Sequence, residues 1–181
     1  MRNVYLDYSA TTPVKEEVLK EMIPYFTEKF GNPSSLYDKG LEAKAAVDHA
    51  REQLAALINA DPKEIYFTAG GTEADNWSLM GVADKLKDKG NHIITTKIEH
   101  HAILHSCEFL EKHGYEVTYL GIDKNGRISL EELKNAITDK TILISVMMVN
   151  NEIGTVQPIK EIGKIAKAHK IIFHTDAVQA L

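Results

Sequence analysis

The sequence is short of cysteine, of excess positive charge and of long apolar runs. Among its 181 residues the single cysteine, Cys107, can form neither an internal disulfide nor the paired-thiol site of a zinc knuckle or a redox motif. The formal net charge of −5 provides no basic field for nucleic acid or an anionic membrane surface. No stretch is apolar for long enough to span a bilayer, and the first residues lack a secretory-signal pattern. We therefore expect a cytoplasmic protein that binds neither nucleic acid nor membranes.

The composition is that of a folded globular chain. Hydrophobic residues make up 44% and charged residues 26% of the sequence, and the length suits one domain or part of one. No repeat, low-complexity tract or linker interrupts it. Residues 1–15 precede the first periodic segment and are predicted to form an N-terminal arm.

The spacing of apolar residues predicts two helices followed by alternating strands and helices. The first two helices are expected at 15–30, bent by Pro24, and at 41–58. Strands are then expected at 64–68, 92–96, 116–120, 142–146 and 171–174, separated by helices at 73–87, 101–113, 130–137 and 159–169, with a further helix starting at 176. This alternation predicts an α/β fold of three layers, with a mostly parallel sheet flanked by helices.

Ligands of open parallel sheets bind beyond the carboxyl ends of the strands, so residues that follow the strands are candidates for a site. Gly70, Gly71 and Thr72 form a glycine turn before a helix, whose free N–H groups could hold a phosphate; alternatively, Thr72 is simply the helix N-cap. His100 follows the second strand. Its imidazole could stack on a ring or move a proton, or it could be a solvent histidine near a helix start.

Two further polar positions follow later strands. Asn150 and Asn151 could orient a ligand by hydrogen bonds, although asparagine in a loop is often only turn chemistry. Asp176 follows the last apolar strand, where a sheltered carboxylate could pair with a cationic ring nitrogen, or could cap the next helix. A phosphate turn, a stacking ring, an amide and an acid at one sheet edge together fit a phosphorylated pyridine cofactor.

Two metal-binding patterns are rejected. His101 and His105 are four residues apart, but a zinc hydrolase motif requires a glutamate where Ala102 stands. Residues 121–132 resemble a calcium loop, yet Gly121 occupies the position of the first ligand and a strand is predicted directly before it. We expect no metal site.

Six short strings occur in the order and approximate spacing found in one enzyme family. They are YLDYSATTP, FGNPSS, GTEADN, IEHHAIL, VNNEIGTVQPI and FHTDAVQA. On these strings the sequence resembles cysteine desulfurases of the NifS/IscS kind, within the class V aminotransferase family of fold type I pyridoxal-phosphate enzymes. The resemblance runs nearly end to end, and it implies that residues 16–181 form part of the large cofactor-binding domain.

The resemblance also implies a set of residues that hold pyridoxal 5′-phosphate. Gly71 and Thr72 would bind the cofactor phosphate. His100 would stack on the pyridine ring and act in catalysis by moving a proton. Asp176 would keep the ring nitrogen protonated, which makes the ring an electron sink, and Gln179 would hydrogen-bond the ring oxygen.

The same resemblance implies the substrate and the partners. Asn151 would lie near the ring hydroxyl and the substrate carboxylate, and Ala10 and Thr11 would lie close to the substrate. The family converts L-cysteine to L-alanine, and it passes the sulfur through a persulfide on a loop cysteine to an iron–sulfur scaffold or another acceptor protein. A homodimer is also expected.

Two groups that this chemistry needs are not found in the sequence. These are the lysine of an SGHK-like segment, which carries the cofactor as a Schiff base, and the loop cysteine; Cys107 instead lies in a predicted helix and is interpreted as structural. In the family the strand expected at 64–68 pairs with strands beyond Leu181. We therefore expect an incomplete chain that is inactive alone and is unstable or prone to associate.

Two other functions stay open at this point. A selenocysteine lyase or another class V enzyme would share the cofactor-binding residues and differ in the segment that this sequence does not contain. A non-catalytic cofactor-binding or interaction fragment would share the fold without the chemistry.

Overall fold

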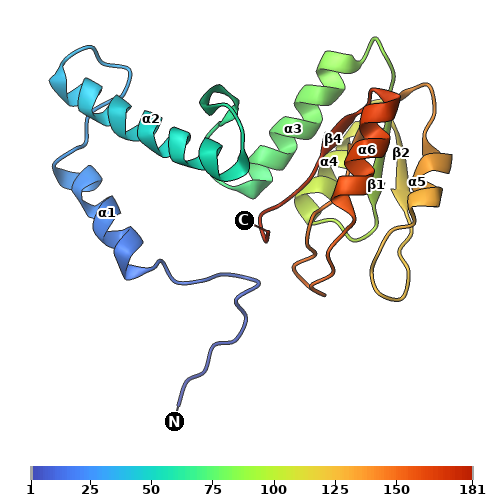
Figure 1. Cartoon of the computed structure of the whole chain (residues 1–181), viewed down its shortest axis with the longest axis horizontal. Helices are drawn as coiled ribbons and strands as arrows, with labels where there is room; N and C mark the ends of the chain where they lie inside the picture. Colours follow the sequence, from blue (N-terminus) through green and yellow to red (C-terminus); the bar gives the residue numbers. More distant parts are fainter. Residues whose placement is uncertain (1, 181) are drawn as a thin grey trace. The chain divides into compact units, whose positions relative to one another are not determined.

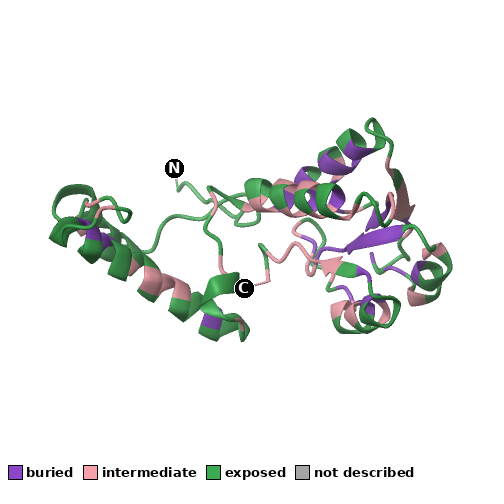
Figure 2. Ribbon diagram, turned by 90° about the horizontal axis from the view of Figure 1, so that it is seen from above, coloured by how far each residue is buried: buried purple, intermediate pink, exposed green. Residues whose placement is uncertain are grey.

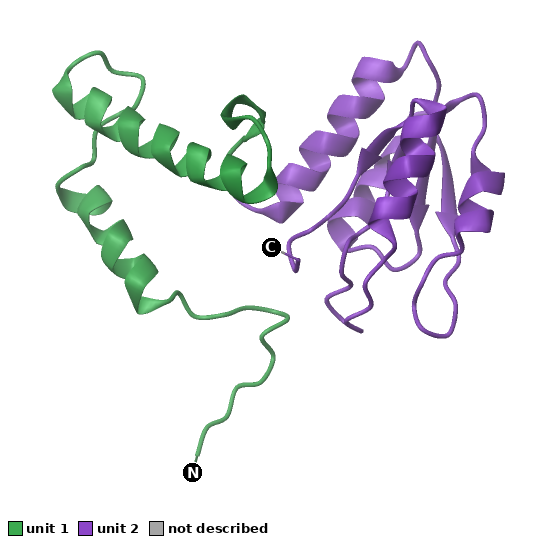
Figure 3. Ribbon diagram, in the orientation of Figure 1, with its two compact units in different colours: residues 1–67 green, residues 68–181 purple. Residues whose placement is uncertain are grey.

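The structure, a computed structural model, describes residues 2–180 of the chain, and it divides into two compact units, Met1–Phe67 and Thr68–Leu181 (Figures 1 and 3). Each unit is described by itself. The predicted division into an arm at 1–15 and a domain at 16–181 stays a prediction.

The first unit contains the two predicted helices. Helix α1 spans Glu16–Thr27, with Pro24 inside it, and helix α2 spans Asp38–Ile58. Helix α2 ends at Asn59, which adopts the left-handed conformation common at helix ends. The short 3-10 helix η1, Pro62–Glu64, follows, and it is stabilised by a reciprocal capping box between Asp61 and Glu64.

The first unit buries very little of its apolar surface. Helix α1 has no buried residue, and those of α2 are the small residues Gly40, Ala43 and Ala55 (Figure 2). The apolar face of α1 is therefore exposed in the described part of the chain; it comprises Val18, Leu19, Met22, Ile23 and Phe26. Exposed apolar surface on this scale is characteristic of a surface that another protein segment covers.

The second unit is the α/β part of the chain (Figure 1). Its elements are α3 Gly71–Leu86, β1 His92–Thr96, α4 His101–Glu111, β2 Glu116–Leu120, α5 Leu130–Ala136, β3 Thr141–Ser145, α6 Ile159–His169 and β4 Ile172–His174. The four strands form one parallel sheet in the order β2-β1-β3-β4. The predicted parallel α/β fold is confirmed.

The sheet separates two apolar clusters, which gives the three layers. Ile94 and Ile144, on neighbouring strands, pack on one face with residues of α5 and α6. Ile93 and Leu143 point to the opposite face and pack with residues of α3 and α4. Successive strand residues face opposite sides of the sheet, and helices cover both sides. The central strands β1 and β3 are therefore buried along their whole length (Figure 2).

The prediction of a strand at 64–68 is wrong for the described structure. Glu64 belongs to η1, and residues 65–68 form no strand; the Ile65 carbonyl instead accepts a hydrogen bond from Arg51 Nε at 3.2 Å. Apolar sequence alone does not make a strand, because its backbone N–H and C=O groups need a neighbouring strand. The prediction of a helix that starts at residue 176 is also wrong for residues 176–180, because residues 178–180 form a turn. Leu181 lies outside the described residues.

Both faces of the sheet should contribute to stability. Replacing Ile94 or Leu143 by Ala should lower the free energy of unfolding by about 2–5 kcal/mol each, because each change leaves a cavity in a fully buried cluster. The matched control is Ile172→Ala on β4, where the side chain is 47% exposed and the loss should be under about 1 kcal/mol. Urea denaturation followed by circular dichroism measures all three, and equal losses would contradict this description of the core.

Candidate functional site

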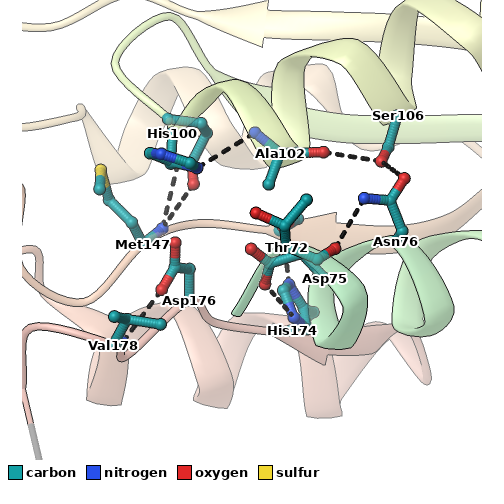
Figure 4. Close-up of polar contacts among 12 residues, drawn as sticks. Thr72, Asp75, Asn76, His100, Ala102, Ser106, Met147, His174, Asp176 and Val178 are labelled. Carbon is teal, nitrogen blue, oxygen red and sulfur yellow. Dashed lines mark hydrogen bonds and ion pairs between the residues drawn. The ribbon is translucent and has the colours of Figure 1, made fainter. Parts of the chain in front are cut away.

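Apart from Ala10 and Thr11, the predicted site residues lie in the second unit, at the start of α3 and after the carboxyl ends of β1, β3 and β4; Thr72, His100 and Asp176 are labelled in Figure 4. Gly71 is the first residue of α3, and His100 is the N-cap of α4. Asn151 lies in the turn after β3, and Asp176 lies two residues after β4. A Cβ added at Gly71 would lie 2.8 Å from Val178 Cγ2, so the segment after β4 closely approaches the start of α3.

The start of α3 is free of side-chain caps. Gly70, and not Thr72, occupies the N-cap position, and no side chain of the described residues caps the helix there. The alternative interpretation of Thr72 as an N-cap is therefore wrong. Because the first N–H groups of a helix lack partners within the helix, this terminus can accept an anionic group, and the exposed Thr72 hydroxyl lies beside it.

The His100 ring is oriented by its own helix. Nδ1 accepts a hydrogen bond from the backbone N–H of Ala102 at 3.1 Å. In the neutral ring the proton therefore resides on Nε2. The side chain is exposed, so this N–H end of the ring can meet a ligand.

The two asparagines have different roles. Asn150 is 5% exposed; its Nδ2 donates to the Ile98 carbonyl at 2.8 Å, and its Oδ1 accepts from the backbone N–H groups of Glu152 and Ile153 at 3.0 Å each. Asn150 therefore provides the turn chemistry. Asn151 is half-buried, and its amide makes only a 3.4 Å contact with Glu152 Oε1, which leaves it available to a ligand.

Asp176 lies among other acidic groups. Its Oδ1 accepts from the Val178 N–H at 3.0 Å in a turn, so it does not cap a helix as the alternative interpretation proposed. Asp75 on α3 and Glu99 after β1 are 4% and 6% exposed. Burial, with the charge of Asp176, raises the pKa of Asp75 to about 6. Burial likewise raises the pKa of Glu99 to about 7, opposed by its hydrogen bonds from Thr96 and Met147.

No lysine or arginine among residues 2–180 forms an ion pair with these three acids. The ion pair recorded for them joins Asp75 Oδ1 to His174 Nε2 at 3.6 Å, which is too long for a hydrogen bond (Figure 4). His174 Nδ1 also lies 2.9 Å from the Ser145 hydroxyl. Burial lowers the pKa of His174, so its imidazole is neutral near pH 7 and does not offset the charge of Asp75, whose pKa of about 6 lies below that pH. The region therefore carries a negative field without a compensating cation.

The sequence interpretation missed Asp75, Glu99 and His174. All three stand within the strings GTEADN, IEHHAIL and FHTDAVQA, one to three residues from a predicted site residue. The available signal was an ionisable residue next to an apolar segment. Their burial depends on packing between elements distant in sequence, which a local pattern does not show.

Three other predicted positions receive less support. Gln179 is exposed in the turn after Asp176. Ala10 and Thr11 are exposed residues of the first unit, so their predicted place near the substrate stays a prediction.

The structural interpretation of Cys107 is confirmed. The residue lies inside α4, is fully buried in the cluster between the sheet and helices α3 and α4, and has a pKa raised to about 12 by burial and neighbouring acids. At neutral pH such a thiol has almost no thiolate, which is the nucleophilic form.

Residues 2–180 contain no group of three or more His, Cys, Asp or Glu side chains placed to hold a metal ion. In that range, no helix combines the length and apolar character needed to cross a membrane.

Comparison with known proteins identifies the family. Residues 4–181 match the family described as aminotransferase class-V. The chain belongs to the class V aminotransferase family. Among curated class V relatives, cysteine desulfurase IscS of Clostridium botulinum is 63% identical over 180 residues, which cover 99% of this chain and 45% of the relative. The chain thus spans about half the length of the curated relatives it matches.

Two solved structures share this fold. A structure described as a NifS-like protein superposes with a TM-score of 0.97 at 41% identity, covering 99% of this chain and 50% of that one. A second, described as SspA in complex with cysteine, gives a TM-score of 0.94 at 44% identity, covering 97% and 51%.

The raised pKa values predict how stability depends on pH. Because the pKa values of Asp75 and Glu99 are higher in the folded chain, the folded state binds more protons, so their contribution is complete at about pH 4 and is lost as pH rises through about 6 and 7. The lowered pKa of His174 has the opposite effect on stability, because its contribution is lost as the pH falls. We expect Asp75→Asn to become more stable relative to the wild type as the pH rises from about 4 to about 6 in urea denaturation, with no further change above that range. The exposed control Asp139→Asn should show no such trend, and a parallel shift of both would contradict the assignment.

Cys107 gives a second prediction. A coloured thiol reagent should react slowly with the folded chain and completely in denaturant, because the buried thiol is both inaccessible and protonated. The positive control is Glu108→Cys in a Cys107→Ala background, which presents an exposed thiol on the same helix. Fast reaction of wild-type Cys107 in the native chain would show that the residue is reactive and not structural.

Proposed function

We propose that this class V chain forms the cofactor-holding part of a cysteine desulfurase, which converts L-cysteine to L-alanine and transfers the sulfur to an acceptor. The observation that carries the proposal is the group of three acids, Asp176, Asp75 and Glu99, without a lysine or arginine partner. A protonated pyridine nitrogen is the cation that such a field favours. The similarity to cysteine desulfurases and to a cysteine-bound neighbour supports this cofactor and this substrate.

The described residues fit pyridoxal phosphate at both ends. Asp176 would pair with the ring nitrogen, while Gly71, Thr72 and the uncapped start of α3 would bind the phosphate. A side chain at position 71 would collide with Val178, so the glycine keeps the two binding segments close together. When bound, pyridoxal phosphate supplies a protonated ring that withdraws electrons from the substrate α-carbon.

The remaining residues would orient the ring and the substrate. His100 would stack on the ring, and its Nε2 would be the atom that moves a proton, since Nδ1 is occupied by the Ala102 N–H. Asn151 would hydrogen-bond the ring hydroxyl and the substrate carboxylate, and Gln179 would contact the ring oxygen. Ala10 and Thr11 are proposed to lie beside the substrate.

The activity is proposed for a protein that contains these residues together with the family's lysine and loop cysteine, which are not among the 181 residues. Cys107 does not replace the loop cysteine, because it is buried and protonated. A homodimer, a sulfur-acceptor protein or iron–sulfur scaffold, and a cytoplasmic location belong to the same proposal. The exposed apolar face of α1 supports a protein contact of this kind.

A chimera tests the function directly. This chain would replace the matching 180-residue segment of the Clostridium botulinum cysteine desulfurase, and alanine release would be measured with L-cysteine and with L-selenocysteine. We expect cysteine to be converted. Asp176→Ala should lower turnover by on the order of 100-fold or more, because the ring nitrogen loses its anionic partner, whereas the distant exposed control Asp139→Ala should not.

Each other result has a defined meaning. Activity only with selenocysteine would identify a selenocysteine lyase, and cofactor absorbance without alanine from either substrate would favour a non-catalytic fragment. Undiminished alanine release by Asp176→Ala would refute the role of Asp176.

A further inference from the structure

The loops that carry His100 and Asn151 are joined by the residues that directly precede them. The two oxygens of Glu99 lie 3.0 and 3.1 Å from the backbone N–H of Met147, and Oε1 also accepts from the Thr96 hydroxyl at 2.7 Å. On the same loop as Met147, Asn150 Nδ2 donates to the carbonyl of Ile98 at 2.8 Å. Both connections therefore run from donors on the loop after β3 to acceptors on the loop after β1.

These contacts begin where the sheet pairing ends. The pairing of β1 with β3 ends at Ile94 and Ile144. Beyond these residues, side chains link the segments that follow the two strands. Along an extended chain, successive N–H groups point to opposite sides. The N–H of Met148 bonds the Asp176 carbonyl at 2.8 Å, on the β4 side, so the N–H of Met147 faces the β1 side and meets Glu99.

A buried glutamate at position 99 lowers the stability of the fold, so a purely stabilising role does not explain it. It is 6% exposed, and its charge is opposed by Asp176 and Asp75. A buried carboxylate loses hydration that its hydrogen bonds only partly replace, and an apolar side chain of similar size is often neutral or stabilising at such a position. The carboxylate does, however, offer two acceptors aimed at one N–H, which a methionine or leucine cannot.

We propose that Glu99 is a positioning residue that sets the separation of His100 and Asn151 by binding the Met147 N–H. Asn150 completes the connection from the opposite loop. Glu99 does not touch the cofactor or the substrate; it acts through the two residues that do. This inference rests on the proposed function, because it is there that His100 and Asn151 meet the ring and the substrate.

Hydrogen exchange measured by mass spectrometry on the chimera tests the connection without reference to activity. Exchange in residues 146–151 should become faster in the order wild type, Glu99→Gln, Glu99→Met, since glutamine keeps one acceptor for Met147 and methionine keeps none. Exchange in the rest of the second unit and the thermal midpoint should change little. The control Glu108→Gln removes an exposed charge from α4 and should leave residues 146–151 unaffected.

Steady-state kinetics on the same variants tests the positioning role. We expect kcat to fall by on the order of 10- to 100-fold in Glu99→Met, to be partly retained in Glu99→Gln and to be unchanged in Glu108→Gln, because a small displacement of His100 misplaces the proton-transfer group. Wild-type kcat in Glu99→Met, unchanged exchange in 146–151, or faster exchange throughout the second unit would each overturn the inference. If the unsubstituted chimera releases no alanine, the proposed function fails, while the exchange series still decides whether Glu99 orders the loop.

Discussion

The backbone of Val146–Met148 is the segment on which the site depends, because it is hydrogen-bonded on both sides. The N–H groups of Val146 and Met148 bond the carbonyls of His174 and Asp176 at 3.1 and 2.8 Å, which continues the β3–β4 ladder beyond the strands. The intervening N–H of Met147 turns the other way and bonds Glu99. One extended segment thus fixes the acid after β4 and the loop after β1 in a single register.

The same arrangement concentrates negative charge. A parallel sheet brings the carboxyl ends of its strands to one edge, and here it brings Glu99 and Asp176 there, with Asp75 added from α3. Two of these carboxyl groups hold their protons to higher pH because they are buried and repel one another. The field at this edge therefore favours a bound cation, and the protonated ring of the proposed pyridoxal phosphate would satisfy that requirement.

Elements with a strong local apolar pattern were predictable from the sequence. The strands at 92–96 and 116–120 and the helix at 159–169 have the predicted limits, since each carries its own periodic apolar residues. The segment 64–68 has an equally apolar sequence but is not a strand, because a strand also depends on a partner. Sequence strings indicated the region of the site, but not the difference between Asn150 and Asn151, which arises from burial and from a hydrogen bond to a carbonyl 52 residues away.

The position of β4 at the end of the sheet has a consequence for solvent. Within residues 2–180 this three-residue strand pairs only with β3, and its Ile172 is 47% exposed. Asp176, which follows it, is therefore the least enclosed of the three acids, and water near its carboxylate screens its charge. A segment that paired with the open side of β4 would remove that water, lower the local dielectric constant and strengthen the attraction between Asp176 and a ring cation. The electronic character of the proposed site would then be controlled by what covers a sheet edge, with no change in any residue proposed to contact the ring.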